Sequence, residues 1–179
     1  MKKSLLILII ALFAVTYSAE AHKRKYSYYK TGYWGNIELN GGAVLSGGSN
    51  IGFSTIFGGR LGHGIAMGVG AGMYIDVQEM YYVYNIPIFL ETKYSPMRSG
   101  KSPFISLRTG FSVTDYLATG FYLSPAFGVD LRRFSLFMRY GFNLFPISAD
   151  ISIPDLDMNI NTKAHLKTHS LSLGIAINF

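Results

Sequence analysis

The chain of 179 residues contains no cysteine. This absence excludes disulfide bonds, thiolate metal sites and a lipid anchor on an amino-terminal cysteine. Charged residues are also scarce, at 15% of the sequence, against about 25% in typical soluble domains. Apolar residues reach 49%, yet beyond the amino terminus no apolar run approaches the roughly 20 residues of a membrane-spanning helix. Apolar residues that are abundant but interleaved with polar ones indicate β-structure with one face in lipid.

The amino terminus has the pattern of a secretory signal peptide. Met1-Lys2-Lys3-Ser4 supplies a basic start, Leu5 to Val15 is apolar throughout, and Ala19-Glu20-Ala21 is a small-residue cleavage site. A helical membrane anchor is the alternative, but eleven apolar residues are too few to cross a hydrocarbon core of about 30 Å. We therefore expect residues 1–21 to be removed, residues 22–32 to form a basic tail, and residues 33–179 to form a single domain.

The formal net charge of +6 raises the alternative of a nucleic-acid partner. Residues 1–21 carry two lysines and one glutamate, a net +1, so the predicted mature chain keeps +5. Much of that excess lies in Lys23-Arg24-Lys25 and Lys30, before the first predicted strand. Because a secreted chain has little access to nucleic acid, we expect no nucleic-acid partner. We interpret the cluster as a solvated basic tail.

Eight segments alternate between apolar and polar residues, as strands with two unlike faces do. In the segment at the carboxyl end, apolar residues from Leu171 to Phe179 take every second position, and small or polar residues take the others. A strand of about 9–11 residues with this alternation suits a membrane crossing. The predicted strands are Tyr33–Val44, Ile51–Leu61, Ile65–Ile75, Val83–Tyr94, Phe104–Val113, Phe121–Leu131, Phe134–Phe145 and His169–Phe179.

Formal charges in these segments fall on the polar face alone. The inward charged residues are Glu38, Arg60, Glu91, Lys93, Arg108, Asp130 and Arg139. The opposite phase would place them in lipid, at about 2–4 kcal/mol for each arginine or lysine near the bilayer centre. Four bases and three acids in a narrow interior predict a salt-bridged lumen, because unpaired burial of charge is costly. We expect Glu38, Arg108 and Arg139 near mid-height and the other four nearer the periplasmic end.

An even number of strands allows antiparallel closure, which satisfies every backbone N–H and C=O group in lipid. We therefore predict an all-β fold, an eight-stranded antiparallel up-and-down transmembrane β-barrel. With the amino terminus taken as periplasmic, the inner turns are residues 62–64, 95–103 and 132–133, and the outer loops lie near 45–50, 76–82, 114–120 and 146–168. Pro87 and Pro125 cannot donate to a ladder, so we expect a local bulge at each.

Aromatic residues near both strand ends predict two interfacial girdles. The predicted girdle residues are Tyr33, Tyr94, Phe134 and Phe179 at the periplasmic end, and Tyr82, Tyr84, Phe111, Phe121 and Phe145 at the outer end. In the third strand all the glycines occupy the inward face. They leave room for water or for a large neighbouring side chain such as Trp34 or Phe137.

Three stretches carry a resemblance to a known family: residues 103–110, residues 120–129, and Ser170 to Phe179. The chain resembles the small outer-membrane β-barrels of the OmpA/OmpX type, and in particular the outer-membrane β-barrel domains common in Bacteroidetes. The resemblance implies a place in the outer membrane of a Gram-negative bacterium, surrounded by outer-membrane lipids and lipopolysaccharide. It also implies that Phe179 forms part of the signal read by the barrel-assembly machinery, whereas lipid-facing packing is the simpler role for that residue.

Catalysis and metal binding both lack a recognisable arrangement. Some eight-stranded barrels are lipid A acyl-modifying enzymes that use a histidine with a serine and an acid, and the candidates here are His165, Ser170 and Asp155 or Asp157. His169 and Ser170 are adjacent, so on a strand they face opposite ways, and His165 has no serine at alternating spacing. A metal site from His165, His169, Asp155 and Asp157 lacks any ligand motif. We expect no enzyme activity, no metal and no cofactor.

The connection 146–168 is the longest. Ala149 to Asn161 alternates, so this stretch either extends the flanking strands as a hairpin turning at Pro154-Asp155 or is an ordinary surface loop. Exposed hairpin edges can add strands from an extracellular partner. We therefore interpret the protein as a non-enzymatic barrel, structural or surface-binding. The alternatives are a narrow pore for small solutes or ions, and a secreted lipocalin-like barrel with its apolar residues inside.

Overall fold

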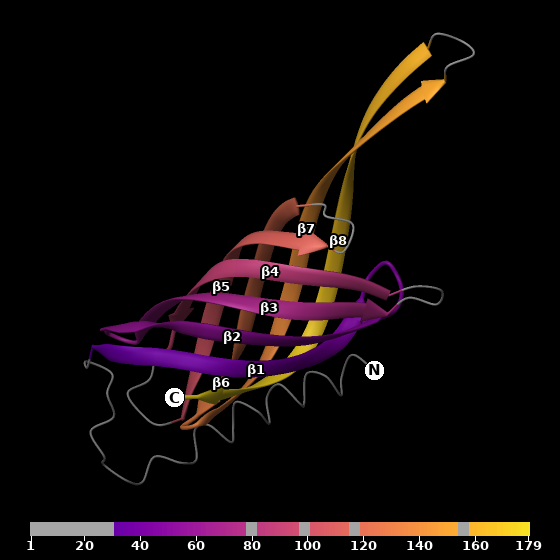
Figure 1. Ribbon diagram of the computed structural model, residues 1–179. Helices are drawn as coiled ribbons and strands as arrows, with labels where there is room; N and C mark the ends of the chain where they lie inside the picture. The colour runs from indigo at the N-terminus through magenta and orange to yellow at the C-terminus, as the bar shows by residue number, and fades with distance from the viewer. Residues whose placement is uncertain (1–30, 78–81, 97–100, 115–118, 154–157) are drawn as a thin grey trace.

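Eight antiparallel strands close into a barrel in sequence order (Figure 1), which confirms the predicted fold class. The computed structural model describes residues 31–77, 82–96, 101–114, 119–153 and 158–179, and the side chains of 147–164 are not described. The predicted signal peptide and most of the basic tail lie outside the described residues. The strands are β1 (Gly32–Val44), β2 (Ser49–Gly62), β3 (Ile65–Val77), β4 (Tyr82–Tyr94), β5 (Lys101–Thr114), β6 (Thr119–Leu131), β7 (Phe134–Ile153) and β8 (Met158–Asn178).

Strands β7 and β8 run well past the barrel. Their register continues from Phe134↔Ile177 to Ile153↔Met158 without a shift, so most of the predicted connection 146–168 is a two-stranded hairpin. Figure 1 shows it projecting beyond the other strands. The hairpin alternative is therefore correct and the surface loop is not, although the predicted turn at 154–155 lies outside the described residues. No helix in the described part of the chain is long and apolar enough to cross a membrane.

The two ends of the barrel differ in their connections. At one end, here called the terminal end, lie Gly32, Asn178 and the tight turns β2–β3 and β6–β7. Both turns use left-handed backbone, at Gly62 (φ 88°) in the first and at Arg132 (φ 65°) in the second. The opposite, hairpin end carries the β7–β8 extension. This division matches the predicted asymmetry of short and long connections.

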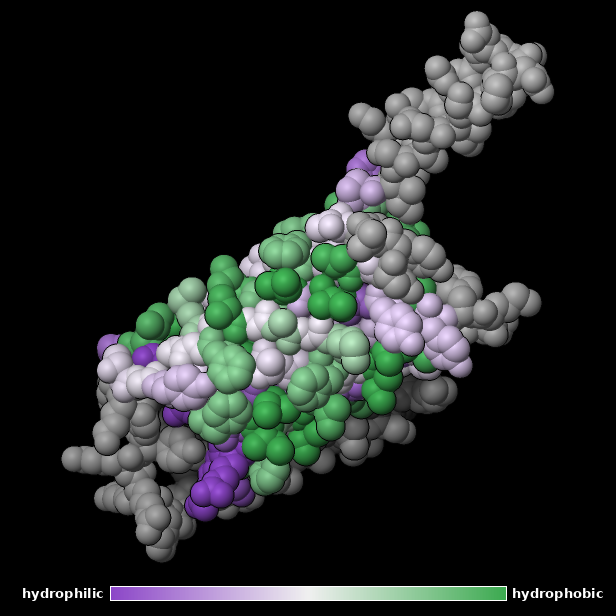
Figure 2. All heavy atoms as spheres, in the orientation of Figure 1, coloured by the Kyte–Doolittle hydropathy of each residue, from purple (hydrophilic) through white to green (hydrophobic). Residues whose placement is uncertain are grey.

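The barrel wall is apolar outside and polar inside. Met67, Phe127 and Ile175 are 45%, 48% and 44% exposed, whereas Arg108 and Arg139 are 0% and 3% exposed. Figure 2 shows the apolar residues spread over the outer wall between the two ends. A lipocalin-like barrel needs the reverse arrangement, so the structure contradicts that alternative. Because apolar side chains gain by leaving water, this wall suits lipid and not an aqueous medium.

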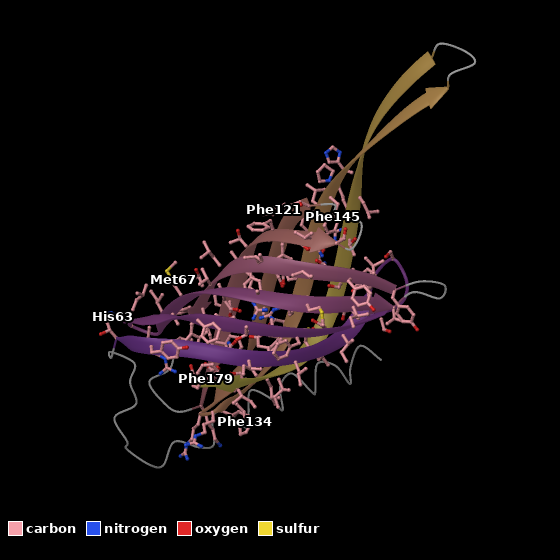
Figure 3. The ribbon with its side chains drawn as sticks, viewed as in Figure 1. His63, Met67, Phe121, Phe134, Phe145 and Phe179 are labelled. Carbon is pink, nitrogen blue, oxygen red and sulfur yellow. The ribbon has the colours of Figure 1, made fainter. Side chains whose placement is uncertain are left out.

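Eight of the nine predicted girdle aromatics lie exposed on the outer wall near one end or the other. Figure 3 shows Phe134 and Phe179 near the terminal end and Phe121 near the hairpin end. Phe145 is the exception, because it occupies an inward position of β7 and is buried. A Cβ at Gly120 would lie 2.4 Å from the Phe145 ring, so this ring packs onto the glycine inside the hairpin end.

Large inward side chains fill the room that inward glycines leave. A Cβ at Gly70 of β3 would lie 2.7 Å from the ring of Phe89, which covers this glycine. Phe137 was expected near the β3 glycines but instead covers Gly174 of β8, where a Cβ would lie 2.3 Å from its ring. Trp34 is buried in a lumen cluster with Ile56, Ala66, Phe89 and Tyr122. The glycines therefore serve close packing and do not line a channel.

The bulges expected at Pro87 and Pro125 are absent. The β3–β4 register is the same at Ala71↔Ile88 and Tyr74↔Asn85, and the β6–β7 register is the same at Leu123↔Phe142 and Ala126↔Arg139. Around each proline the ladder lacks two residue pairs, but the register is the same on both sides, so no residue is inserted. Beside Pro125, the hydroxyl of Ser124 donates to the Tyr140 carbonyl at 3.0 Å. This side chain supplies the donor that the opposing proline lacks, so no bulge is needed.

Replacing Ser124 by alanine should lower the free energy of unfolding by about 1 kcal/mol, because the Tyr140 carbonyl loses its substitute donor. Urea unfolding in lipid vesicles, followed by circular dichroism, measures the change. Ser106→Ala is the matched control, since Ser106 is also a buried inward serine but its hydroxyl has no partner in the described part of the chain. Equal effects of the two substitutions would contradict the assigned role of Ser124.

Candidate functional site

Four inward charged residues meet inside the barrel and form what we call the central ion cluster: Glu38 of β1, Glu91 of β4, Arg108 of β5 and Arg139 of β7. Strand alternation places each side chain inward, and β4–β5 pairing sets Glu91 directly opposite Arg108. Arg108 lies 2.6 Å from a carboxylate oxygen of Glu38 and 2.6 Å from one of Glu91. Arg139 reaches the same Glu38 oxygen at 2.6 Å.

The central ion cluster is neutral overall and almost completely removed from solvent. The Ser54 hydroxyl accepts from Nη1 of Arg108 at 3.2 Å and donates to Glu38 at 3.3 Å. Each guanidinium also faces an aromatic ring, with 4.4 Å between Arg108 Cζ and the Phe89 centroid and 4.6 Å between Arg139 Cζ and the Phe137 centroid. Such contacts stabilise a desolvated cation by about 2 kcal/mol or more. The surrounding side chains thus offset part of the cost of burying these charges.

A second, smaller group occupies the terminal end of the lumen. Lys93 Nζ lies 2.6 Å from Asp130 Oδ1 and 4.0 Å from the centroid of the Phe104 ring. The hydroxyls of Ser95 and Ser135 donate to the two oxygens of Asp130, at 3.2 and 2.5 Å. We call Lys93 and Asp130 the terminal pair. Its charges also cancel, so the lumen holds two separately neutral groups.

Of the seven predicted lumen charges, Arg60 alone belongs to neither group. Arg60 is half-buried near the terminal end, and no ion pair of Arg60 is found within the described part of the chain. Glu91 was expected nearer the periplasmic end with Lys93. It instead belongs to the central ion cluster, because the register sets it opposite Arg108. Strand position alone misplaced Glu91, since neighbouring strands in a tilted barrel are staggered.

The cavity that the described residues leave beside the central ion cluster is small. A cavity of about 20 Å³ lies on the hairpin side of the central ion cluster, lined in part by Tyr74, Tyr122 and Arg139. This volume suits one or two water molecules and no larger solute. Inward aromatic side chains account for much of the filling, and of these only Trp34 and Phe137 were predicted. The signal for the others was present, because Phe89, Phe104 and Tyr122 share the phase of the charged residues.

The described residues considered for catalysis or metal binding are not brought together. Ser170 lines the lumen cavity, whereas His165 is exposed on the opposite face of β8. His169 also lies on the outer face, and its hydrogen-bond partner there is the Tyr140 hydroxyl. Asp155 and Asp157 lie outside the described residues. Among the described residues, no three His, Asp or Glu side chains are grouped to hold a metal ion.

Phe179 lies at the seam that closes the barrel. Its backbone exchanges two hydrogen bonds with Gly35 of β1, at 3.0 and 3.1 Å. Its ring is half-exposed on the outer wall, with centroids 6.2 Å from both Tyr33 and Phe57. A Cβ at Gly35 would lie 2.8 Å from this ring, so the glycine makes room for it. Lipid-facing packing therefore describes Phe179 in the folded barrel, and its role in assembly stays a prediction.

Replacing Arg108 by methionine should lower the free energy of unfolding by about 3–5 kcal/mol, because Glu91 loses its ion-pair partner and Glu38 keeps only Arg139. Urea unfolding in lipid vesicles measures the loss. Arg60→Met makes the same change at a half-buried position outside any described ion pair. It should cost less than about 1 kcal/mol. A small loss for Arg108→Met would mean that the central ion cluster does not hold the barrel together.

No protein-family model matches the sequence, and no curated protein matches it. Solved structures do match in fold. The outer membrane enzyme PagL shares 14% sequence identity with a TM-score of 0.59, over 79% of this chain and 98% of PagL. Neisserial surface protein A (NspA) shares 14% identity with a TM-score of 0.51, over 84% of this chain and 99% of NspA. The fold is therefore that of the small eight-stranded outer-membrane β-barrels.

Proposed function

We propose that this protein is a non-enzymatic outer-membrane barrel with a closed lumen, which anchors the β7–β8 hairpin above the membrane as a binding element. The observation that carries the proposal is the central ion cluster, which ties β1, β4, β5 and β7 together across the interior. A pore needs a continuous aqueous path. Buried ion pairs and a cavity of about 20 Å³ favour a plug instead.

The proposed location is the outer membrane of a Gram-negative bacterium, reached after cleavage of the signal peptide at residue 21. The apolar outer wall supports this location, because only lipid can cover so much exposed apolar surface in a single barrel. Outer-membrane lipids and lipopolysaccharide are then its immediate surroundings. The terminal end faces the periplasm and the hairpin end faces outward, and Phe179 serves as the residue read by the barrel-assembly machinery.

The absence of enzyme activity is part of the same proposal. Acyl transfer or hydrolysis by a serine nucleophile needs a serine hydroxyl within about 3 Å of a histidine nitrogen. In the described part of the chain, the hydrogen-bond partner of His169 is a tyrosine, and Ser170 faces the lumen. This arrangement supports binding over catalysis.

The hairpin supports a surface-binding role because its outer edges pair with no other described strand. Strand β6 pairs with β7 as far as Leu144, and β1 pairs with β8 as far as Ser170. Beyond these residues, no described strand pairs with the outer edge of β7 or of β8. Free edges of this kind present rows of backbone donors and acceptors to an incoming strand. An extracellular partner would bind residues 146–168 by strand addition.

The purified full-length chain should give no steady single-channel conductance in planar lipid bilayers, because the lumen is plugged. The positive control is a variant with Glu38, Glu91, Arg108 and Arg139 all replaced by serine, which should produce small open steps if its barrel still forms. Circular dichroism in the same lipid reports barrel formation. Stable ion-conducting steps from the unaltered protein would refute the closed-lumen proposal in favour of the narrow pore.

Shortening the hairpin should remove surface binding without unfolding the barrel. In this variant Asn-Gly replaces residues 147–164, since that dipeptide favours a two-residue hairpin turn between Pro146 and His165. Cross-linking on intact cells that produce the full-length protein should capture an extracellular partner, and the shortened chain should lose it. If the full-length and the shortened protein captured the partner equally, the partner would bind outside the hairpin. Heat-resistant migration in detergent gels checks that both barrels are folded.

A further inference from the structure

An apolar groove of about 670 Å³ runs along the outer wall of the barrel. This volume lies within the range of about 300–1,000 Å³ that ligand sites usually have. The groove crosses the outer faces of β4 to β8, and its lining includes Ile105, Leu107, Pro125, Phe127, Met138, Tyr140 and Leu171. It also contains Pro125, where the β6–β7 ladder lacks two pairs. A groove in this wall faces the hydrocarbon of the membrane.

A polar site adjoins the groove at Tyr140. The Tyr140 hydroxyl and Nδ1 of His169 share a hydrogen bond, and their rings lie 5.9 Å apart. The Phe142 ring lies 5.2 Å from the imidazole and helps to fix it. When Tyr140 donates this hydrogen bond, the proton of a neutral imidazole sits on Nε2. Nε2 of His169 has no hydrogen-bond partner within the described part of the chain. Its N–H group is therefore available to an acceptor outside the protein.

A lysine and a second histidine follow His169 on the same face of β8. Residues 171 to 179 present only apolar side chains outward, and the next outward positions toward the hairpin are His169, Lys167 and His165. Lys167 and His165 are exposed, and Lys167 has no ion-pair partner among the described residues. Two residues along a strand span about 7 Å. A single phosphate group can therefore bridge His169 and Lys167.

We propose that this face binds one membrane lipid with an anionic phosphate headgroup. Its acyl chain lies in the groove, and its phosphate oxygens accept from Nε2 of His169 and from Nζ of Lys167. This inference rests on the membrane location given as the proposed function. The occupant is a lipid because the groove is continuous with the lipid-facing wall, and it is anionic because the adjoining groups are donors or cations.

Tryptophan quenching by lipids with brominated acyl chains tests the site. Leu173→Trp places a reporter on the outer wall of β8, in register with Met138 of the groove, and Val69→Trp places one on β3 away from it. Trp34 is buried in the lumen and gives both proteins the same background. The full-length chain is reconstituted in phosphatidylcholine vesicles that contain brominated phosphatidylglycerol or brominated phosphatidylcholine. The ratio of the two quenching constants measures headgroup preference at each wall.

At the Leu173→Trp reporter, phosphatidylglycerol should be preferred over phosphatidylcholine about fivefold. At the Val69→Trp reporter the preference should stay below about twofold, since the described outward positions of β2, β3 and β4 hold no lysine or arginine. Lys167→Gln combined with His169→Gln should abolish the preference at the first reporter. Arg133→Gln removes an exposed positive charge at the other end of the barrel and should leave the preference unchanged.

A change inside the groove tests the acyl chain separately from the headgroup. Met138→Phe adds volume to the groove lining and should weaken the preference at the Leu173→Trp reporter. Met67→Phe makes the same change on a wall outside the groove and should have no effect (Figure 3). An unchanged preference in Met138→Phe would mean that the groove does not hold the chain.

The outcomes separate this inference from the proposed function. If neither lipid quenches either reporter, the barrel is not in the bilayer and the proposed location fails. If both lipids quench both reporters equally, the location stands and the lipid site is refuted. The same preference at both reporters would reflect the overall positive charge of the chain, and it would also overturn the site.

Discussion

Mutual neutralisation of buried charge is the constraint on which the rest of this structure depends. A wall that faces lipid leaves the interior as the place for ionised side chains, and an eight-stranded interior is too narrow to hydrate them. Arg108 forms ion pairs with both Glu38 and Glu91, and Arg139 forms a second ion pair with Glu38, so the four charges neutralise one another. The four residues come from four strands, so the cluster also fixes how strands distant in sequence face one another.

Much of this fold could be predicted from the sequence because a strand in a lipid-facing barrel has only two faces, and charge tolerates only one of them. The inward phase of Arg108 and Arg139 followed from that rule. Partner identity did not follow, since it depends on the stagger between strands, and Glu91 was misplaced for this reason. The length of β7 and β8 was also underestimated, because alternation in residues 149–161 does not reveal whether it belongs to a loop or to a hairpin.

The errors at Pro125 and Phe145 have local causes. A bulge was expected at Pro125 because proline has no backbone N–H group to donate to the ladder. In β6 the side-chain hydroxyl of the preceding residue, Ser124, donates to the opposing carbonyl instead. Phe145 was assigned to a girdle by its height on the strand, but height does not determine which side of the wall a ring occupies. The groove beside Tyr140 and His169 could not be predicted at all, because it arises from five strands whose outer residues are far apart in sequence.

The seam between β1 and β8 has a consequence for how the barrel forms. Gly35 and Phe179 lie near opposite extremes of the sequence, yet they exchange the hydrogen bonds that complete the cylinder. Joining such distant segments carries a large loop-closure entropy and belongs late in folding. Until then β1 keeps an open edge of unpaired amides and carbonyls, which is prone to aggregate in water. The nascent sheet therefore needs shielding on its way to the bilayer, and closure ends that need.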